Sequence, residues 1–127
     1  MSGALVVIRS AAAVVAGYLL FALTAVALFQ ATGQAPHARA SPAFMLGTAC
    51  YGMFFAAAGG WLAAYLSRAR PLLQGLLLAA LIGAGATVSL MYSGAAATWS
   101  QWQALLLMAP MAVAGAALRA RQCRARR

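Results

Sequence analysis

Long apolar stretches alternate with short polar connections along the chain, and this pattern predicts four helices. The apolar stretches cover about 4–30, 43–66, 71–92 and 99–118. Each is long enough to cross the hydrocarbon core of a bilayer, which takes about 20 residues of helix. We therefore expect an all-α fold, an integral membrane four-helix bundle with short loops that forms a single transmembrane domain over residues 1–127.

The connections carry the residues that end and start helices. They read ATGQAPHARASP, SRAR and SGAAAT, and none is long enough for a soluble domain. Ser41 followed by Pro42 predicts an N-cap with proline at the first helical position, and Pro71 predicts the same position in the third helix. Thr98 and Gln101 have the spacing of a capping box at the start of the fourth helix.

The first apolar stretch has an alternative interpretation as a cleaved signal peptide. Arg9 would form a short basic region, and HARA before Ser41 resembles a cleavage site. The core of the stretch, residues 11–29, is longer than the usual apolar region of a signal peptide, about 7–15 residues. A retained transmembrane helix, with Arg9 reaching the membrane surface, is the favoured interpretation.

Composition supports a membrane setting. Apolar residues make up 65% of the chain, only 7% of residues are charged, and none is acidic. This apolar excess over ordinary soluble domains must face lipid. The net charge of +9 comes from arginine, and a basic chain can bind nucleic acid. Because these arginines flank apolar segments, we expect no nucleic-acid partner and interpret them as determinants of topology.

The distribution of arginine predicts the orientation. With four spans both termini lie on one side, and eight of the nine arginines lie there, against Arg39 on the other. The eight are Arg9, Arg68, Arg70, Arg119, Arg121, Arg124, Arg126 and Arg127. The positive-inside rule then places both termini in the cytoplasm. The basic tail, 119–127, is expected to serve topology and to meet anionic lipid headgroups, with an acidic protein partner as the alternative.

Small residues recur every four positions on two consecutive helices. The second helix has Thr48, Gly52, Ala56, Gly60 and Ala64, and the third has Gly75, Ala79, Gly83 and Thr87. Small residues allow helices in lipid to approach closely. We expect the second helix to pack through this face against the third helix or a second copy of the chain, with Gly59 widening the face. The alternative is that the spacing is an accident of an alanine- and glycine-rich composition.

The absence of Asp and Glu excludes several chemistries. A pair of carboxylates for acid–base catalysis and a Ser-His-Asp triad are both impossible. Proton- or ion-coupled transporters usually rely on intramembrane carboxylates or histidines, so such coupling is not expected. Cys50 and Cys123 lie at different expected depths, which argues against a disulfide, and no Cys/His cluster suggests a metal. We expect no cofactor and no enzymatic activity.

A few polar residues remain as candidates for a role. His37, the only histidine, has no carboxylate to orient it, so we expect a solvated loop histidine; the alternative is a base, or a haem ligand paired with Met45 or Met53. Pro110 is expected to kink the fourth helix and free the carbonyl of Leu106.

Polar side chains within the spans are Thr24, Thr48, Gln74, Thr87 and Ser89. Such groups usually bond to a backbone carbonyl or to a neighbouring helix in the membrane. That is the expectation here, and a small polar cavity lined by them is the alternative.

The chain resembles the uncharacterised four-span proteins common in bacterial inner membranes. The features that carry the resemblance are VAGYLLFAL, YGMFFAAAGGWLAA and LLLMAPMAVAGA. The resemblance implies a bacterial inner-membrane location and supplies no catalytic residue. The chain is also similar to small multidrug transporters in size and number of spans, but residues 11–29 lack the glutamate that couples those transporters to protons.

These observations leave three hypotheses for function. The first is a non-catalytic membrane component that packs with itself or within a larger complex. The second is a small transporter or a holin-like permeability protein. The third is a lipid- or quinone-binding membrane subunit.

Overall fold

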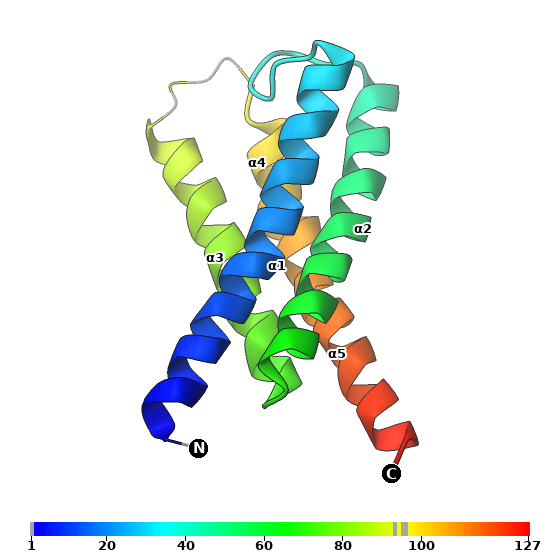
Figure 1. The fold of residues 1–127 in the computed structure, drawn as a ribbon. Helices are drawn as coiled ribbons and strands as arrows, with labels where there is room; N and C mark the ends of the chain where they lie inside the picture. The colour runs from blue at the N-terminus through cyan, green and yellow to red at the C-terminus, as the bar shows by residue number, and fades with distance from the viewer. Residues whose placement is uncertain (1, 93, 95–96) are drawn as a thin grey trace.

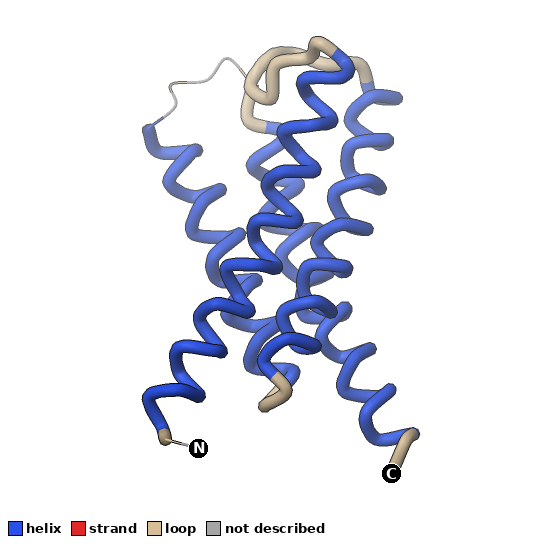
Figure 2. The backbone as a smooth tube through the Cα atoms, viewed as in Figure 1, coloured by secondary structure: helices blue, strands red, loops and turns tan. Residues whose placement is uncertain are grey.

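Four helical rods stand side by side, and each runs antiparallel to the one before it (Figure 1). The computed structural model describes residues 2–92, 94 and 97–127. The first three rods are α1 (Gly3–Thr32), α2 (Pro42–Ser67) and α3 (Pro71–Tyr92), and the fourth joins α4 (Trp99–Gln103), a π-helical turn η1 (Ala104–Met108) and α5 (Ala109–Ala125). Within the described ranges there is no strand (Figure 2), so the predicted all-α four-helix fold is confirmed.

The two ends of the bundle differ in what they carry. The N-terminus, the C-terminus and the 68–70 link lie at one end, which we call the terminal end (Figure 1). The 33–41 loop and the start of α4 lie at the opposite end, which we call the loop end.

Most large apolar side chains face outward, and small ones fill much of the interior. Leu23, Phe54 and Leu106 are each about two-thirds exposed (64%, 66% and 66%), whereas Ala56 and Ala112 are fully buried. All four rods are long and apolar enough to cross a membrane. In lipid, apolar side chains on the outside carry no penalty, and small residues inside let backbones approach closely. The fold is that of a multi-pass membrane protein.

Most of the predicted helix starts are present. The Ser41 hydroxyl accepts a hydrogen bond from the Phe44 backbone N–H (3.2 Å), with Pro42 at the first position of α2. Pro71 is the first residue of α3. The predicted capping box at Thr98 is wrong, because the Thr98 side chain makes no capping hydrogen bond. The side chain of Gln101 is used elsewhere, in contacts described below.

The fourth rod is longer than predicted, because α5 continues to Ala125 and takes in most of the basic tail. Two contacts hold this extension against the end of α2. The indole N–H of Trp61 donates to Gln122 Oε1 (2.8 Å), and the Arg119 guanidinium lies over the rings of Trp61 and Tyr65, 5.7 and 5.0 Å from their centroids. The expected helix end at 118 is therefore wrong.

The small face of α2 is buried along its length: Thr48, Gly52, Ala56, Gly60 and Ala64. Its two glycines, Gly52 and Gly60, lie against Met108 and Ala112 of the fourth rod, whereas the expected partner was the third helix or a second copy of the chain. A Cβ atom on Gly60 would overlap the backbone carbonyl of Ala112, and one on Gly115 would overlap that of Ala57. The expected partner was wrong because every helix of this chain is rich in small residues, so spacing alone does not identify the neighbour.

Gly59 serves a different contact from Gly60. A Cβ on Gly59 would lie 2.6 Å from the carbonyl oxygen of Gly17 in α1. Successive residues of a helix point about 100° apart, since a turn takes 3.6 residues. The glycine pair therefore lets α2 approach two helices closely at one level, α1 through Gly59 and α5 through Gly60.

The expected small face of α3 is only partly used. Gly75 is buried against Ala116 and Val113 of α5. A Cβ atom on Gly83, by contrast, would meet nothing closer than Leu105 Cδ2 at 3.7 Å. Ala79 is half-buried beside the core, and Thr87 is exposed. The buried row of α3 lies one position earlier: Gln74, Leu78, Ile82 and Ala86. The contact face of α3 therefore combines large and small side chains.

Candidate ligand cavity

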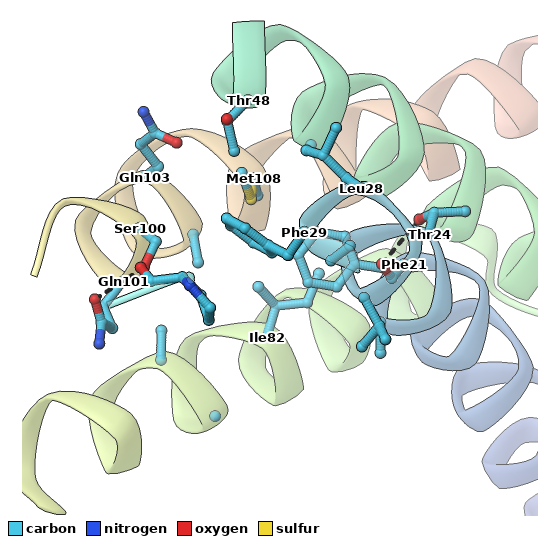
Figure 3. A pocket seen from close by; sticks show the side chains of 18 of the residues that line it. Phe21, Thr24, Leu28, Phe29, Thr48, Ile82, Ser100, Gln101, Gln103 and Met108 are labelled. Atoms are coloured by element: carbon cyan, nitrogen blue, oxygen red, sulfur yellow. Dashed lines mark hydrogen bonds between the residues drawn. The ribbon is translucent and has the colours of Figure 1, made fainter. Parts of the chain in front are cut away.

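A cavity of about 520 Å³ lies in the loop-end half of the bundle, and all four rods line it. Side chains from α1, α2, α3 and the fourth rod converge on it (Figure 3). Its apolar wall includes Tyr18, Phe21, Phe29, Tyr51, Ile82, Ala86 and Met108. At about 30 Å³ for a water-sized group, this volume holds roughly 17 non-hydrogen atoms.

The cavity reaches the outer surface between α1 and α3. Three residues that line it, Val26 and Gln30 of α1 and Gly85 of α3, are also exposed. The two helices cross, and the C-terminal half of α3 leans away from α1 (Figure 1). Gly85 adds no side chain at this mouth, where a Cβ would come within 3.4 Å of the Tyr18 hydroxyl. The mouth faces sideways, toward the position of lipid around a membrane bundle.

The middle of the bundle closes the cavity on its inner side. Ala56, Leu78 and Ala112, from α2, α3 and α5, are each 0% exposed. They belong to one hydrophobic cluster with Ile82 and Met108, which line the cavity. The described residues therefore form a pocket with a filled floor.

Polar groups gather at the loop end of this cavity. Gln101, only 4% exposed, donates from Nε2 to His37 Nδ1 (2.7 Å) and to the Ser89 hydroxyl oxygen (3.2 Å). The Ser100 hydroxyl donates to the Pro36 carbonyl oxygen (2.7 Å) and lies 3.1 Å from Gln101 Oε1. Pro36 takes part through its backbone carbonyl, and the other four residues take part through their side chains. All five residues line the cavity.

Tertiary contacts place His37 in this cluster. The 33–41 loop is held against α4 by the Ser100 bond and by the Trp99 indole N–H, which donates to the Ala38 carbonyl oxygen (2.8 Å). His37 is half-buried and bonded to Gln101, so the expectation of a solvated loop histidine is wrong. The partner is 64 positions away in the sequence. The polar start of the fourth span, at the same end as the loop, was the signal that could have found it.

The polar residues within the spans divide into two groups. Thr24, Thr48 and Thr87 each bond to a backbone carbonyl four positions earlier, as expected for hydroxyls in membrane helices. Gln74 bonds across to Ser10 of α1 through Nε2, near the terminal end. Thr24, Thr48 and Ser89 all line the cavity, which was the alternative interpretation, and Ser89 differs because it also joins the polar cluster.

Gln103 contributes a buried amide beside the cavity. Its Nε2 donates to the Met45 carbonyl oxygen (2.8 Å), which fastens the start of the fourth rod to α2. Its Oε1 is covered by protein atoms and has no hydrogen-bond partner among the residues that the structure describes. Protein atoms shield that oxygen, so it does not offer an acceptor to a molecule in the cavity.

Charged side chains stay away from the cavity. No arginine lines it, and the sequence contains no acidic residue. Arg9 donates from Nε to the Leu66 carbonyl oxygen (2.8 Å) at the terminal end. Arg68 and Arg70 form the link there, both with positive φ angles of 57° and 41°. Cys50 and Cys123 are both unpaired and exposed. The cavity therefore suits an uncharged guest.

The tail arginines present their charge at the terminal end. Arg121, Arg124, Arg126 and Arg127 are exposed, and Arg119 is half-buried against the α2 rings. No group of three or more His, Cys, Asp or Glu side chains comes together anywhere in the described ranges. The structure thus separates a basic terminal end from an uncharged cavity at the loop end.

Comparison of the chain with protein-family models, curated protein sequences and solved structures finds no match. The resemblance to four-span bacterial inner-membrane proteins stays a prediction. A function must therefore be argued from the cavity and from the distribution of charge.

Proposed function

We propose that the protein is a non-catalytic membrane protein that holds one uncharged, lipid-soluble molecule in the loop-end cavity. The observation that carries this proposal is the cavity itself, with an apolar wall, a polar end at His37 and Gln101, and a sideways mouth between α1 and α3. An amphipathic molecule would place its polar head at the cluster and its chain along the aromatic wall. Binding sites for small molecules commonly combine such a wall with a few fixed polar groups.

The other hypotheses receive less support. The filled layer at Ala56, Leu78 and Ala112 weighs against a pore through one copy of the bundle, which a permeability function would need. A purely structural role would leave a cavity of about 520 Å³, with fixed polar groups at one end, without use. A binding subunit, alone or within a larger complex, is favoured because it uses the cavity.

For location, we infer a bacterial inner membrane with both termini in the cytoplasm. Eight arginines at the terminal end against Arg39 in the loop support this orientation under the positive-inside rule. The helical tail then lies beside anionic headgroups, which attract basic residues by roughly 1 kcal/mol each.

A cavity-filling substitution tests the proposed function. Ala25 lines the cavity, whereas Ala27, two positions away on α1, is exposed and does not. The Ala25→Trp side chain should occupy the binding space. We expect the protein purified in mild detergent to retain one lipid-soluble molecule by native mass spectrometry, and Ala25→Trp to lose at least about nine-tenths of it.

Ala27→Trp is the matched control, and we expect it to retain the wild-type amount. Equal retention by Ala25→Trp, with both variants folded by circular dichroism, would overturn the proposal. Failure of the wild-type protein to retain or take up any lipid-soluble molecule would overturn it as well.

A further inference from the structure

The geometry points to a guest whose polar head is an uncharged carbonyl group, as in a lipid ketone, a fatty ester or a quinone. This inference rests on the proposed function and specifies the ligand class of the same cavity. It follows from counting the hydrogens and lone pairs of the polar cluster.

The Gln101 amide nitrogen is saturated. It carries two hydrogens. One is donated to His37 Nδ1 at 2.7 Å and the other to the Ser89 hydroxyl oxygen at 3.2 Å. Gln101 is 4% exposed, which leaves its amide little freedom to turn toward a guest. This buried amide therefore fixes the roles of its two partners and does not itself hold the ligand.

The roles of the two partners follow. Because an amide nitrogen can only donate, His37 Nδ1 is the acceptor of this bond, and the ring hydrogen is then on Nε2. Because the Ser89 oxygen accepts, its own hydrogen is left to donate. Neither hydrogen has an acceptor within the described part of the chain. His37 and Ser89 both line the cavity, so each offers a donor to a guest.

Acceptors at the polar end are already occupied or covered. The Pro36 carbonyl oxygen receives the single hydrogen of the Ser100 hydroxyl. Gln101 Oε1 lies 3.1 Å from that hydroxyl oxygen and belongs to a side chain that is only 4% exposed, so it is covered rather than occupied. Gln103 Oε1 is enclosed by protein atoms. The polar end therefore presents donors to the cavity, and a carbonyl oxygen, with two lone pairs and no hydrogen, complements it.

The lack of charged side chains around the cavity narrows the class of head group further. A carboxylate or phosphate head would need a cation, and the cavity lining has none. An ammonium head would need an acid, and the chain has none. With space for roughly 17 non-hydrogen atoms, the cavity holds a head and part of a chain, and a longer chain would leave through the mouth at Val26 and Gly85.

Matched probes test the inference. Delipidated protein in detergent is titrated with a long-chain methyl ketone, the secondary alcohol of the same chain and the corresponding alkane, with affinity measured by thermal shift and native mass spectrometry. We expect the ketone to bind at least about fivefold more tightly than either, the factor for about one neutral hydrogen bond. A benzoquinone with the same chain distinguishes a quinone from a ketone or ester as the source of the carbonyl group. Tighter binding of the benzoquinone than of the ketone identifies a quinone, and weaker binding identifies a ketone or ester.

Variants locate the donors. Ser89→Ala should reduce the preference for ketone over alkane by about fivefold and leave alkane binding unchanged. Thr87→Ala is the control on the same helix, since the Thr87 hydroxyl bonds to the Gly83 carbonyl oxygen and does not line the cavity. His37→Phe keeps a planar ring, removes the other donor and should have an effect similar to that of Ser89→Ala.

The outcomes separate the two proposals. Equal binding of all three probes would overturn the carbonyl inference and leave the proposed function intact. Tighter binding of the alcohol would overturn it too, because it would mean that the cluster offers acceptors. Binding of none of the probes would overturn both.

Discussion

At the scale of single residues, the bundle depends on backbone-to-backbone contacts that only glycine permits. Gly60 lies against the Ala112 carbonyl and Gly115 against the Ala57 carbonyl, so α2 and α5 approach each other closely from both sides. Such contacts gain dispersion energy that is small per atom pair and substantial when summed. They replace the hydrophobic driving force, which lipid does not supply.

Replacing Gly60 with alanine should therefore destabilise the fold. The new methyl group would overlap the Ala112 carbonyl, a backbone atom that cannot turn aside. We expect Gly60→Ala to lower the free energy of unfolding in detergent by about 1–3 kcal/mol, the usual cost of overpacking. Denaturation followed by circular dichroism measures it.

Gly83→Ala is the matched control, because the new methyl group would meet nothing closer than Leu105 Cδ2 at 3.7 Å. Its effect should be neutral or slightly stabilising, since alanine is the better helix former. If Gly60→Ala were no more destabilising than this control, the close α2–α5 contact would be contradicted.

At the scale of elements, the two ends of the fourth rod differ in local structure. Near the loop end, the π-helical turn η1 closes with the Ala109 N–H donating to the Ala104 carbonyl, and Pro110 follows directly. Proline lacks the N–H of a regular helix, and the wider turn before it accommodates that loss. Near the terminal end, the rod extends as a basic helix held by aromatic side chains of α2.

The extension should loosen when its anchor is weakened. Trp61→Phe keeps an aromatic ring beside Arg119 but removes the N–H that donates to Gln122. We expect the backbone amides of 119–125 to exchange hydrogen about fivefold faster, the factor for about one lost neutral hydrogen bond. Hydrogen exchange read by mass spectrometry gives the rate.

Trp102→Phe serves as the comparison, because Trp102 is 51% exposed and lies in α4, at the other end of the fourth rod from 119–125. It should leave the exchange of 119–125 unchanged. Unchanged exchange in Trp61→Phe would show that the extension is helical without this anchor.

At the scale of the whole molecule, the separation of charge makes a topology prediction. Eight arginines at the terminal end should hold both termini in the cytoplasm. Reporter fusions after Arg127 and within 68–70 should give cytoplasmic signals, and a fusion within 34–40 should give an external one. An external signal from the fusion after Arg127 would contradict the proposed orientation.

The amount that the sequence could predict differs by scale. The four helices followed from apolar length, and the buried face of α2 contains the residues expected from four-residue spacing. The partner of that face was predicted wrongly, because Gly75 and Gly115, on different helices, are equally small. A polar cavity was only the alternative interpretation, because the His37–Gln101 and Gln101–Ser89 bonds depend on how α3 and the 33–41 loop meet α4.

The central claim, that the loop-end cavity holds a lipid-soluble molecule that enters between α1 and α3, is tested most directly by photolabelling. A lipid ketone with a diazirine in its chain is incorporated with the protein into liposomes, irradiated, and mapped by peptide mass spectrometry. The account predicts labels concentrated on the cavity side chains of 18–29 and 82–89, lost on addition of excess unlabelled ketone. Labels spread evenly over lipid-facing positions outside these ranges, such as Phe54 and Leu118, and insensitive to that competitor, would contradict it.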